Sequence, residues 1–457
     1  MDTPNTTHSR SRRALAGVTA VLMTVSACSL TATTEDSVSA DASVEISGET
    51  VDGGIGAIQL TGSSSTATLW DSSTVHDIDI QFDEDEYLAA VVAYTETGDK
   101  EWISATVTID GVTYQDVGLR LKGNSSLFSL NLETSGNPED LPWLIRLDKY
   151  IDHQNHEGVY DIVIRSNSTE TAMNEAVALE LLGEAGLATE EAVATAFTIN
   201  DGDTELRLAM ELPADEWAES TFGDNDFVLY KAESTGDYSY RGDDPDSYDE
   251  VFDLEGGDDD MEPLIDFLEF INNTDDETFA AELADHLDVE LFATYLAYQD
   301  LVSNGDDIDG RGNNSYLYYD RDADLMTVVN WDLNLAFGTA NVGGAGGPGG
   351  FGDRPEGAPE GPPEGVREGG AGFAGPGAGG AGGTNVLSER FRSIDEFASM
   401  IDTATAELTE SLYADGTANE ILATWVEVLT SKAGGLVTAD QVASEAGAIE
   451  AAFPASS

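Results

Sequence analysis

Hydrophobic and polar residues alternate with a period of two through much of the first half of the chain. The clearest run is HDIDIQF, which begins at His76, and residues 54–69 have the same character. Residues 87–122 continue the pattern with YLAAVVAYTET and with two β-rich runs joined by Asp110-Gly111, a dipeptide typical of hairpin turns. PWLIRLDKYI and VYDIVIRSN indicate two more strands. We therefore expect the first part of the chain to be mostly sheet.

The spacing of apolar residues then changes to that of helices. Residues 169–186 predict a helix that stops at Gly186, and residues 191–213 return to strands around the turn Asn200-Asp201-Gly202. Residues 261–303 are helical throughout, and SYLYYD and LMTVVNWD then predict a strand pair. This order predicts a two-lobed α+β protein, with a β-rich lobe to about residue 230 and a helical lobe after it.

The C-terminal third contains a segment of low complexity. Residues 343–384 are rich in Gly, Pro, Ala and Glu and cannot bury enough apolar surface to fold. Residues 386–454 predict two or three amphipathic helices, within a terminal segment, 385–457, that we expect to pack on the second lobe. The folded domain is therefore expected to span residues 54–342, with these helices added.

The composition is strongly acidic. The 457 residues include 88 acidic and 19 basic side chains, a formal net charge of -69. Such a charge repels nucleic acids and anionic membrane surfaces, so binding to nucleic acid is excluded as a function. Its simplest role is to keep the surface solvated in salty or extracellular surroundings.

The N-terminus has the pattern of an export signal. Arg10, Arg12 and Arg13 precede an apolar stretch that is too short to span a membrane. The stretch ends in Val-Ser-Ala-Cys28, which resembles the bacterial lipobox, where the cysteine receives a diacylglycerol. Cys28 is the only cysteine, so it forms no internal disulfide. We expect a signal peptide over residues 1–28, a tether over 29–53, and a lipid anchor outside the cytoplasm; the Sec and twin-arginine routes both stay open.

One polar motif is basic. Arg120 and Lys122 are two apart in a predicted strand and so share a face, and Gly123-Asn124-Ser125-Ser126 follows at once. Amide groups of such a turn, with two cations beside them, form a cradle for phosphate oxygens. The alternative is a strand end with a solvated turn. The scarcity of positive charge, with only five lysines in the chain, favours a function for the pair.

Two further motifs are acidic. Residues 304–320 contain Asp306, Asp307, Asp309, Asn313 and Asn314 in a Gly-rich turn, but the EF-hand pattern fails there, and a solvated loop is the alternative.

In VNWDLNLAFG, Asp332 and Asn334 are two apart within an apolar run, where an unpaired carboxylate is costly to bury. With Asn313 or Asn314 they could hold Mg²⁺, which needs few protein ligands. His153 and His156 have no partners for a zinc site and are expected at the surface, and no nucleophile elbow or P-loop is present.

These motifs, in this order, resemble the CotH family of atypical secreted kinases, named for spore-coat protein H. Arg120–Ser126 matches its opening motif, and the closing motif matches Trp331 to Gly338. Between them lie LIRLDKY with Arg146 and Lys149, a helix with Glu175 or Glu180, Leu229-Tyr230-Lys231, and Asn304 and Asp306 with Asn313 and Asn314. The resemblance covers about residues 75–340.

The resemblance implies a kinase-like fold that uses ATP and Mg²⁺. The implied metal ligands are Asp332, Asn314, Asn313 and Asn334. Asn334 stands where many members of the family carry an acid. Asp306 and Asp309 compete for the catalytic role on the acceptor hydroxyl. The implied nucleotide-binding residues are Arg120, Lys122, Asn124, Ser125, Arg146, Lys149, Glu175 and Lys231.

The resulting hypothesis is a lipid-anchored extracytoplasmic protein kinase that phosphorylates Ser or Thr of a surface or secreted protein. The alternative is a catalytically silent surface module that kept the fold and binds an envelope or extracellular partner.

Overall fold

A computed structural model of the protein describes residues 68–123, 125–127, 130, 137–233, 237–309, 314–341 and 385–454. All of these belong to the second of two compact units, Ile55–Ser457. The expected signal peptide, Cys28, the tether, the strand before residue 68, Asn124, Asn313 and the segment 343–384 lie outside the described residues, as does the side chain of Ser125. The described part is α+β, β-rich in its N-terminal region and helical towards its C-terminus.

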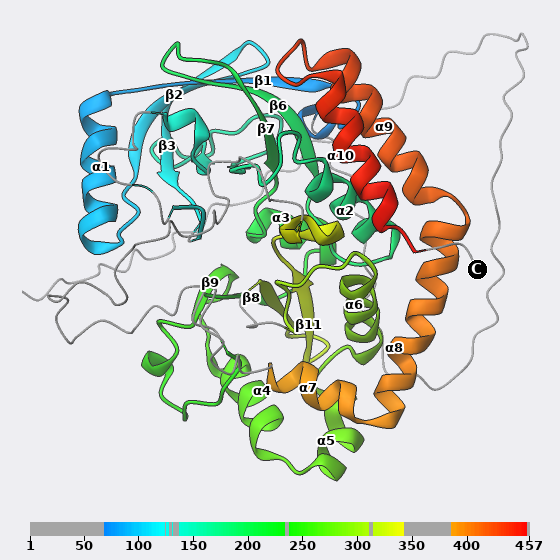
Figure 1. Ribbon diagram of the computed structural model, residues 1–457. Coiled ribbons are helices and arrows are strands. Elements are labelled where there is room, and N and C mark those ends of the chain that lie inside the picture. Colours follow the sequence, from blue (N-terminus) through cyan, green and yellow to red (C-terminus); the bar gives the residue numbers. More distant parts are fainter. Residues whose placement is uncertain are drawn as a thin grey trace, which may run out of the picture. The chain divides into compact units, whose positions relative to one another are not determined.

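Seven strands form a closed barrel in the order β1-β2-β3-β4-β5-β7-β6. Figure 1 labels β1, β2, β3, β6 and β7 of this barrel. Their bounds are β1 Val75–Phe82, β2 Ile103–Ile109, β3 Val112–Leu121, β4 Trp143–Arg146, β5 Asp161–Ile164, β6 Ala192–Ile199 and β7 Glu205–Met210. Among these seven described strands, β1 and β6 pair in parallel and the other neighbours are antiparallel. Alternate side chains fill the barrel, such as Ile103, Ala105 and Val107 of β2.

Both predicted hairpin turns are confirmed. Asp110 and Gly111 join β2 to β3, and Asn200 and Asp201 follow β6 before β7 begins. All four residues have positive φ, between 47° and 83°, which favours Gly, Asn and Asp. The turn chemistry visible in the sequence therefore sets these two connections.

The expectation of a strand at YLAAVVAYTET is wrong, because these residues belong to helix α1, Glu84–Thr97. The Asp83 side chain caps the helix by accepting from the amides of Asp85 and Glu86, and Gly98, with a φ of 83°, ends it. Tyr87, Ala90 and Val91 are buried at helical spacing. The capping residues on both sides outweigh the β-prone composition of the run.

Helix α2, Met173–Glu184, lies between β5 and β6 in the chain and is almost entirely buried. It contacts β6 of the barrel and two helices from the end of the chain. Most of its side chains are accordingly apolar, although Asn174 and Glu175 are buried with them. Of the three glutamates on α2, Glu175 is buried in the interior, whereas Glu180 is half-buried and Glu184 is exposed.

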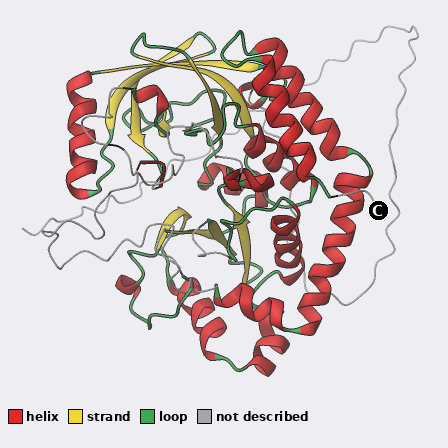
Figure 2. Cartoon of the chain, viewed as in Figure 1, coloured by secondary structure: helices red, strands yellow, loops and turns green. Residues whose placement is uncertain are grey.

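The second sheet has four strands in the order β11-β10-β8-β9. They are β8 Phe227–Ala232, β9 Phe252–Gly257, β10 Ser315–Asp320 and β11 Leu325–Asn330. The helices of this part are α3 Asp215–Phe222, α4 Glu262–Asn273, α5 Asp276–Glu282 and α6 Val289–Leu301. Figure 2 shows the strands gathered in the barrel and in this smaller sheet. The sequence predicted neither α3 nor β9.

The last helices connect both parts. They are α7 Val386–Ser393, α8 Asp395–Leu408, a π-helical segment Thr409–Ala414, α9 Thr417–Lys432 and α10 Ala439–Ala452. Helices α7 and α8 contact α4 and α6, whereas α9 and α10 contact α2, and α9 also contacts β1 (Figure 1). Short 3₁₀ segments lie at Thr68–Trp70, Ser125–Leu127, Pro138–Asp140, Pro245–Ser247, Leu283–Asp285 and Ala336–Asn341. No described helix is long and apolar enough to cross a membrane.

Candidate active site

Asp332 lies just after β11, not within it. The strand ends at Asn330, and the backbone of Asp332 is left-handed, with a φ of 66°. Its side chain is 23% exposed. The expectation of one extended segment that points Asp332 and Asn334 the same way therefore does not hold. Leaving the strand spares Asp332 the full cost of burial.

The carboxylate of Asp332 is paired with Arg165, which follows β5 directly. The Nη2 atom of Arg165 contacts Oδ1 of Asp332, and it also lies 2.9 Å from Oε1 of Glu175 on α2. Nε of Arg165 also donates to Oε2 of Glu175 at 3.1 Å. Arg165 thus joins the end of the barrel, α2 and the segment after β11 in one charged cluster.

Burial sets the protonation of this cluster. The side chain of Glu175 is only 3% exposed, and its burial raises its pKa to about 7, although Arg165 opposes this. The two carboxylates raise the pKa of Arg165 against its own burial, so it stays charged. Arg165 was not among the predicted site residues. Its only sequence signal was a cation after a strand in a chain that has few.

The segment after Asp332 is tied to α2 by its main chain. The carbonyl of Asn334 accepts from Nδ2 of Asn174 at 2.6 Å and from Oγ of Ser168 at 2.9 Å. Glu180, the alternative to Glu175, accepts instead from the indole of Trp425 on α9 at 2.8 Å. Of the two acids proposed on this helix, Glu175 is the one in contact with the site.

A buried amide network holds the loop that precedes β10. Gln299 of α6 donates to Asn330 at 2.7 Å, and Asn304 donates to Gln299 at 3.0 Å. Nδ2 of Asn314 donates to the carbonyl of Asp306 at 2.5 Å. Ser315 at the start of β10 pairs with Asn330 at the end of β11. Asn314 and Trp331 are the next residues on either side of this pair, and Asp332 follows Trp331. The sheet register thus brings the loop and Asp332 to the same edge.

The aspartates of this loop have different surroundings. Asp309 is bound by Nε and Nη2 of Arg392 on α7 at 2.7 and 2.6 Å, and Arg392 also binds Asp300. Asp307 is buried, and this raises its pKa to about 7. Asp306 is half-buried, and its carbonyl accepts from Asn314. Asp309 therefore anchors the C-terminal helices, whereas Asp306 is the candidate base adjoining Asn314.

Lys122 reaches towards the same place from the end of β3. Its Nζ lies 5.2 Å from the ring centroid of Trp331, beside Arg165 at 5.8 Å from the same ring. Burial lowers the pKa of Lys122 to about 7, helped by Lys231, Arg120 and Lys100 and opposed by Glu255. A buried lysine with a lowered pKa is a candidate functional group.

Three of the other predicted basic residues surround a different tryptophan. The cationic groups of Arg120, Lys149 and Arg146 lie 4.8, 4.8 and 5.6 Å from the ring centroid of Trp102. Arg146 also forms a bidentate pair with Asp161 on β5. Lys231 on β8 is bound to Glu233 at 2.5 Å. The predicted nucleotide-binding cations are therefore divided between two places.

Most other cations of the described chain are neutralised. Arg207, Arg241, Arg321 and Arg390 each pair with an aspartate, as Arg146, Arg165 and Arg392 do. Within the described ranges, no carboxylate lies within ion-pair distance of Arg120, Lys122 or Lys149. In so acidic a protein, Lys122 over Trp331 and Arg120 with Lys149 over Trp102, all without a carboxylate at ion-pair distance, indicate places where an anionic ligand could bind.

The proposed metal ligands are few, so they fit a cation that is also bound by oxygen atoms of the substrate. Among the described residues, no group of three or more His, Cys, Asp or Glu side chains could hold a metal ion. Mg²⁺ is commonly bound by one or two carboxylates together with phosphate oxygens and water. Asp332 with the side-chain oxygen of Asn314 suits that arrangement.

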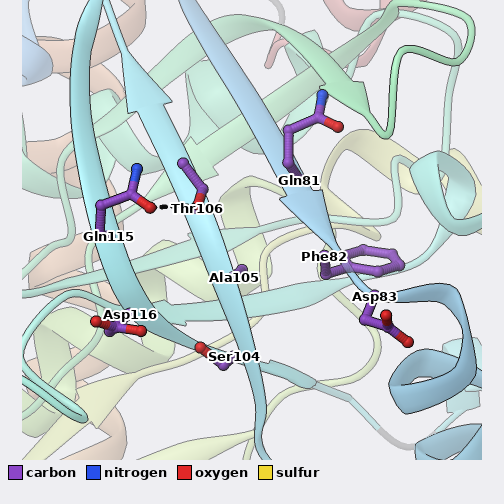
Figure 3. Close-up of a pocket in the computed structure, with 8 residues that line it drawn as sticks. All are labelled: Gln81, Phe82, Asp83, Ser104, Ala105, Thr106, Gln115 and Asp116. Carbon is purple, nitrogen blue, oxygen red and sulfur yellow. Dashed lines mark hydrogen bonds between the residues drawn. The ribbon is translucent and has the colours of Figure 1, made fainter.

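Two other features lie away from this cluster. A hollow of about 360 Å³ lies on the barrel strands, and none of the predicted site residues lines it. Figure 3 shows its lining residues, among them Gln81, Thr106 and Asp116. His156, expected at the surface, is buried, and its Nδ1 lies 3.0 Å from the hydroxyl of Tyr114.

Comparison with known families identifies one match. The family described as CotH kinase protein matches residues 119–443, which include Arg120, Lys122, Arg165, Glu175, Asp306 and Asp332. No curated protein matches the chain. The matched range begins on β3 of the barrel and ends on α10, so it spans both sheets.

Proposed function

Because this chain belongs to the CotH kinase family, we propose that it transfers the γ-phosphoryl group of ATP to a Ser or Thr hydroxyl. The acceptor is a surface or secreted protein, and the reaction uses Mg²⁺. The family itself supports a kinase-like protein. The specific reaction and its residues are our proposal.

The observation that carries the proposal is the position of Lys122. Lys122 follows β3, is half-buried and lies over the ring of Trp331. Among the described residues it has no carboxylate within ion-pair distance. Asp332 is the residue directly after Trp331, so the lysine and the aspartate approach the same tryptophan. A triphosphate placed between Lys122 and Asp332 supplies the missing negative charge. It would also restore the proton that burial makes Lys122 prone to lose.

The other residues take roles that follow from their contacts. Asp332 and Asn314 would hold Mg²⁺, which neutralises charge on the phosphates. Glu175, through Arg165, positions Asp332 relative to α2. The acceptor oxygen attacks the γ-phosphorus, its proton passes to the carboxylate of Asp306, and the bond from the γ-phosphorus to the bridging oxygen breaks to release ADP.

We also propose that the two parts of the described chain correspond to the lobes of a kinase-like fold. The barrel contributes Lys122 on β3 and Arg165 after β5, and the sheet of β8 to β11 contributes Asp332 and the loop before β10. The two sets meet through Arg165 and Trp331. This arrangement supports catalysis between two lobes.

Export and lipid attachment remain part of the proposal. The support is the basic and apolar pattern before Cys28, the sole cysteine. Labelling with a radioactive fatty acid in a bacterial host, compared with Cys28→Ala, tests it. Label in both proteins, or in neither, counts against the anchor.

The kinase proposal is tested with purified protein, γ-labelled Mg-ATP and a Ser-rich protein substrate. Label should enter the substrate with the wild type and not with Asp332→Ala. A second measurement, thermal stabilisation by Mg-ATP, reports binding without catalysis. Label that persists in the variant, or stabilisation without any label in the wild type, would overturn phosphoryl transfer.

The Arg165–Asp332 ion pair also favours a second candidate, a silent kinase-like module that binds an envelope or extracellular partner. An arginine that occupies an oxygen of Asp332 competes with Mg²⁺ for that oxygen. Nucleotide binding without transfer, or neither, is the outcome expected of such a module.

A further inference from the structure

The cations around Trp102 gather on a different ring from Lys122, although Arg120 is close enough to Lys122 to help lower its pKa. Lys122 and Arg165 gather on Trp331, beside Asp332, whereas Arg120, Arg146 and Lys149 gather on Trp102. Trp102 lies just before β2, and Lys149 lies in the loop after β4. We call Trp102, Arg120 and Lys149 the Trp102 box.

The box is built into the strands rather than formed by loose side chains. Gly118 of β3 lies beneath it, and a Cβ atom there would come within 2.5 Å of Cβ of Lys149 and 3.0 Å of the Trp102 ring. A glycine in a strand interior is unfavourable unless close approach requires it. Arg146 is fixed by its two hydrogen bonds to Asp161. The sequence thus makes room for the Lys149 stem against β3.

The cations of the box form no close ion pair among the described residues, although Glu255, Asp161 and Asp253 act on Arg120 from a greater distance and partly oppose the fall in its pKa that burial causes. Neither Arg120 nor Lys149 has a carboxylate within ion-pair distance among the residues the structure describes, and Nε of Arg120 is buried there without a hydrogen-bond partner. Lys149 is exposed to solvent. An anion that reaches the box from solvent would gain hydrogen bonds that no described residue supplies.

The surroundings of the box indicate a protein ligand. Tyr150 and Ile151, next to Lys149, are 48% and 39% exposed, and they are two of the four large hydrophobic side chains that stand exposed in the described chain. An apolar and aromatic patch beside arginine and lysine is typical of a protein interface. A nucleotide phosphate alone would leave this patch unused.

We propose that the Trp102 box docks an anionic side chain of the acceptor protein, followed in that protein by an apolar residue that packs on Tyr150 and Ile151. The chemistry recognised is an oxyanion, either the carboxylate of Asp or Glu or the phosphate of a phosphorylated residue. The inference rests on the proposed function and adds to it a class of acceptor. Because the chain as a whole carries a net charge of -69, an acidic segment gains little elsewhere, which gives the box selectivity.

Binding of fluorescent peptides, measured by anisotropy without ATP, tests the proposal independently of catalysis. The probes are a Ser-containing peptide with a Glu-Leu pair, the same peptide with phosphoserine-Leu, and a Gln-Leu control. Wild type should bind the first or the second at least about fivefold more tightly than the third, as expected of a charge-assisted contact. Equal binding of all three peptides overturns the proposal.

Variants locate the contact. Lys149→Ala should lose the preference for the anionic peptide, Lys149→Arg should keep it, and Lys432→Ala, which removes a lysine of α9, should match the wild type. Thermal stabilisation by Mg-ATP is measured on the same proteins. If Lys149→Ala instead loses only nucleotide stabilisation, the box belongs to the nucleotide and the inference is wrong. If the peptide preference holds but no protein transfers phosphate, the kinase proposal fails and the docking site stands.

Discussion

Arg165 and Asp332 form an ion pair although 167 positions separate them in the chain. Arg165 also binds Glu175, so one guanidinium neutralises two carboxylates that would otherwise repel each other in a buried place. The pair connects the barrel to the sheet of β8 to β11. The candidate active site depends on this contact more than on any single sequence motif.

Arg165→Met should destabilise the protein by about 3 kcal/mol or more at pH 8, because it leaves two acids uncompensated. Urea unfolding measures this. The control is Arg241→Met, whose pair with Asp237 is exposed and should contribute less than about 1 kcal/mol. Similar losses in the two variants would show that the Arg165 cluster is not a coupled buried unit.

Stability should depend on pH through Glu175. Its folded-state pKa is raised from 4.5 to about 7, so the folded protein holds the proton more tightly than the unfolded chain. This contribution to stability is fully present below about pH 4.5 and is lost as pH rises through about 7. Wild type should therefore lose about 2–3 kcal/mol relative to Glu175→Gln between pH 4.5 and 8. A difference between the two proteins that stays constant with pH contradicts this.

Nucleotide affinity should fall as pH rises above 7. In the free protein the pKa of Lys122 is lowered to about 7, and bound phosphates raise it again, so binding takes up a proton above that pH. The Kd for Mg-ATP should increase with pH by up to about tenfold per unit until the pKa of the complex is reached. Titration calorimetry of Mg-ATP binding in buffers of different ionisation enthalpy measures the number of protons taken up on binding. Lys122→Met should bind weakly with little dependence on pH, and Lys432→Met should behave as the wild type.

Asp306 and Asp309 should respond differently to amide substitution. Asp306→Asn should lower kcat by at least about 100-fold, as expected of a general base, with nucleotide stabilisation retained. Asp309→Asn weakens the contact with Arg392 and should mainly lower the melting temperature. Transfer assays and thermal unfolding of both variants check this. A larger loss of kcat in Asp309→Asn would reverse the assignment.

The end of the chain should influence α2. Glu445 of α10 accepts from the amides of Glu170 and Thr171, which lie just before Ala172, the N-cap residue of α2. Glu445→Ala should cost about 1–2 kcal/mol in urea unfolding, as expected when hydrogen bonds to a charged acceptor are lost. Glu450→Ala, an exposed change on the same helix, is the control. A change in kcat with Glu445→Ala but unchanged KM for ATP would indicate that α10 also positions Glu175.

The sequence by itself determined features whose causes are local. Turn dipeptides set both hairpins, helical spacing identified α2 and α6, and the order of motifs at Arg120, Asn304 and Asp332 identified the family. Turn formation and helical spacing depend on a few neighbouring residues, and each family motif is also a short run of residues. Where local signals competed, as in α1, composition misled and the capping residues decided.

Only the tertiary structure decided which charges meet. Arg165 has no motif around it, and its pairing with Glu175 and Asp332 depends on how β5, α2 and the segment after β11 pack. The same holds for Arg392, which binds Asp309, and for the division of the basic residues between Trp331 and Trp102. Electrostatic partners are set by distance and burial in space, which sequence separation does not encode.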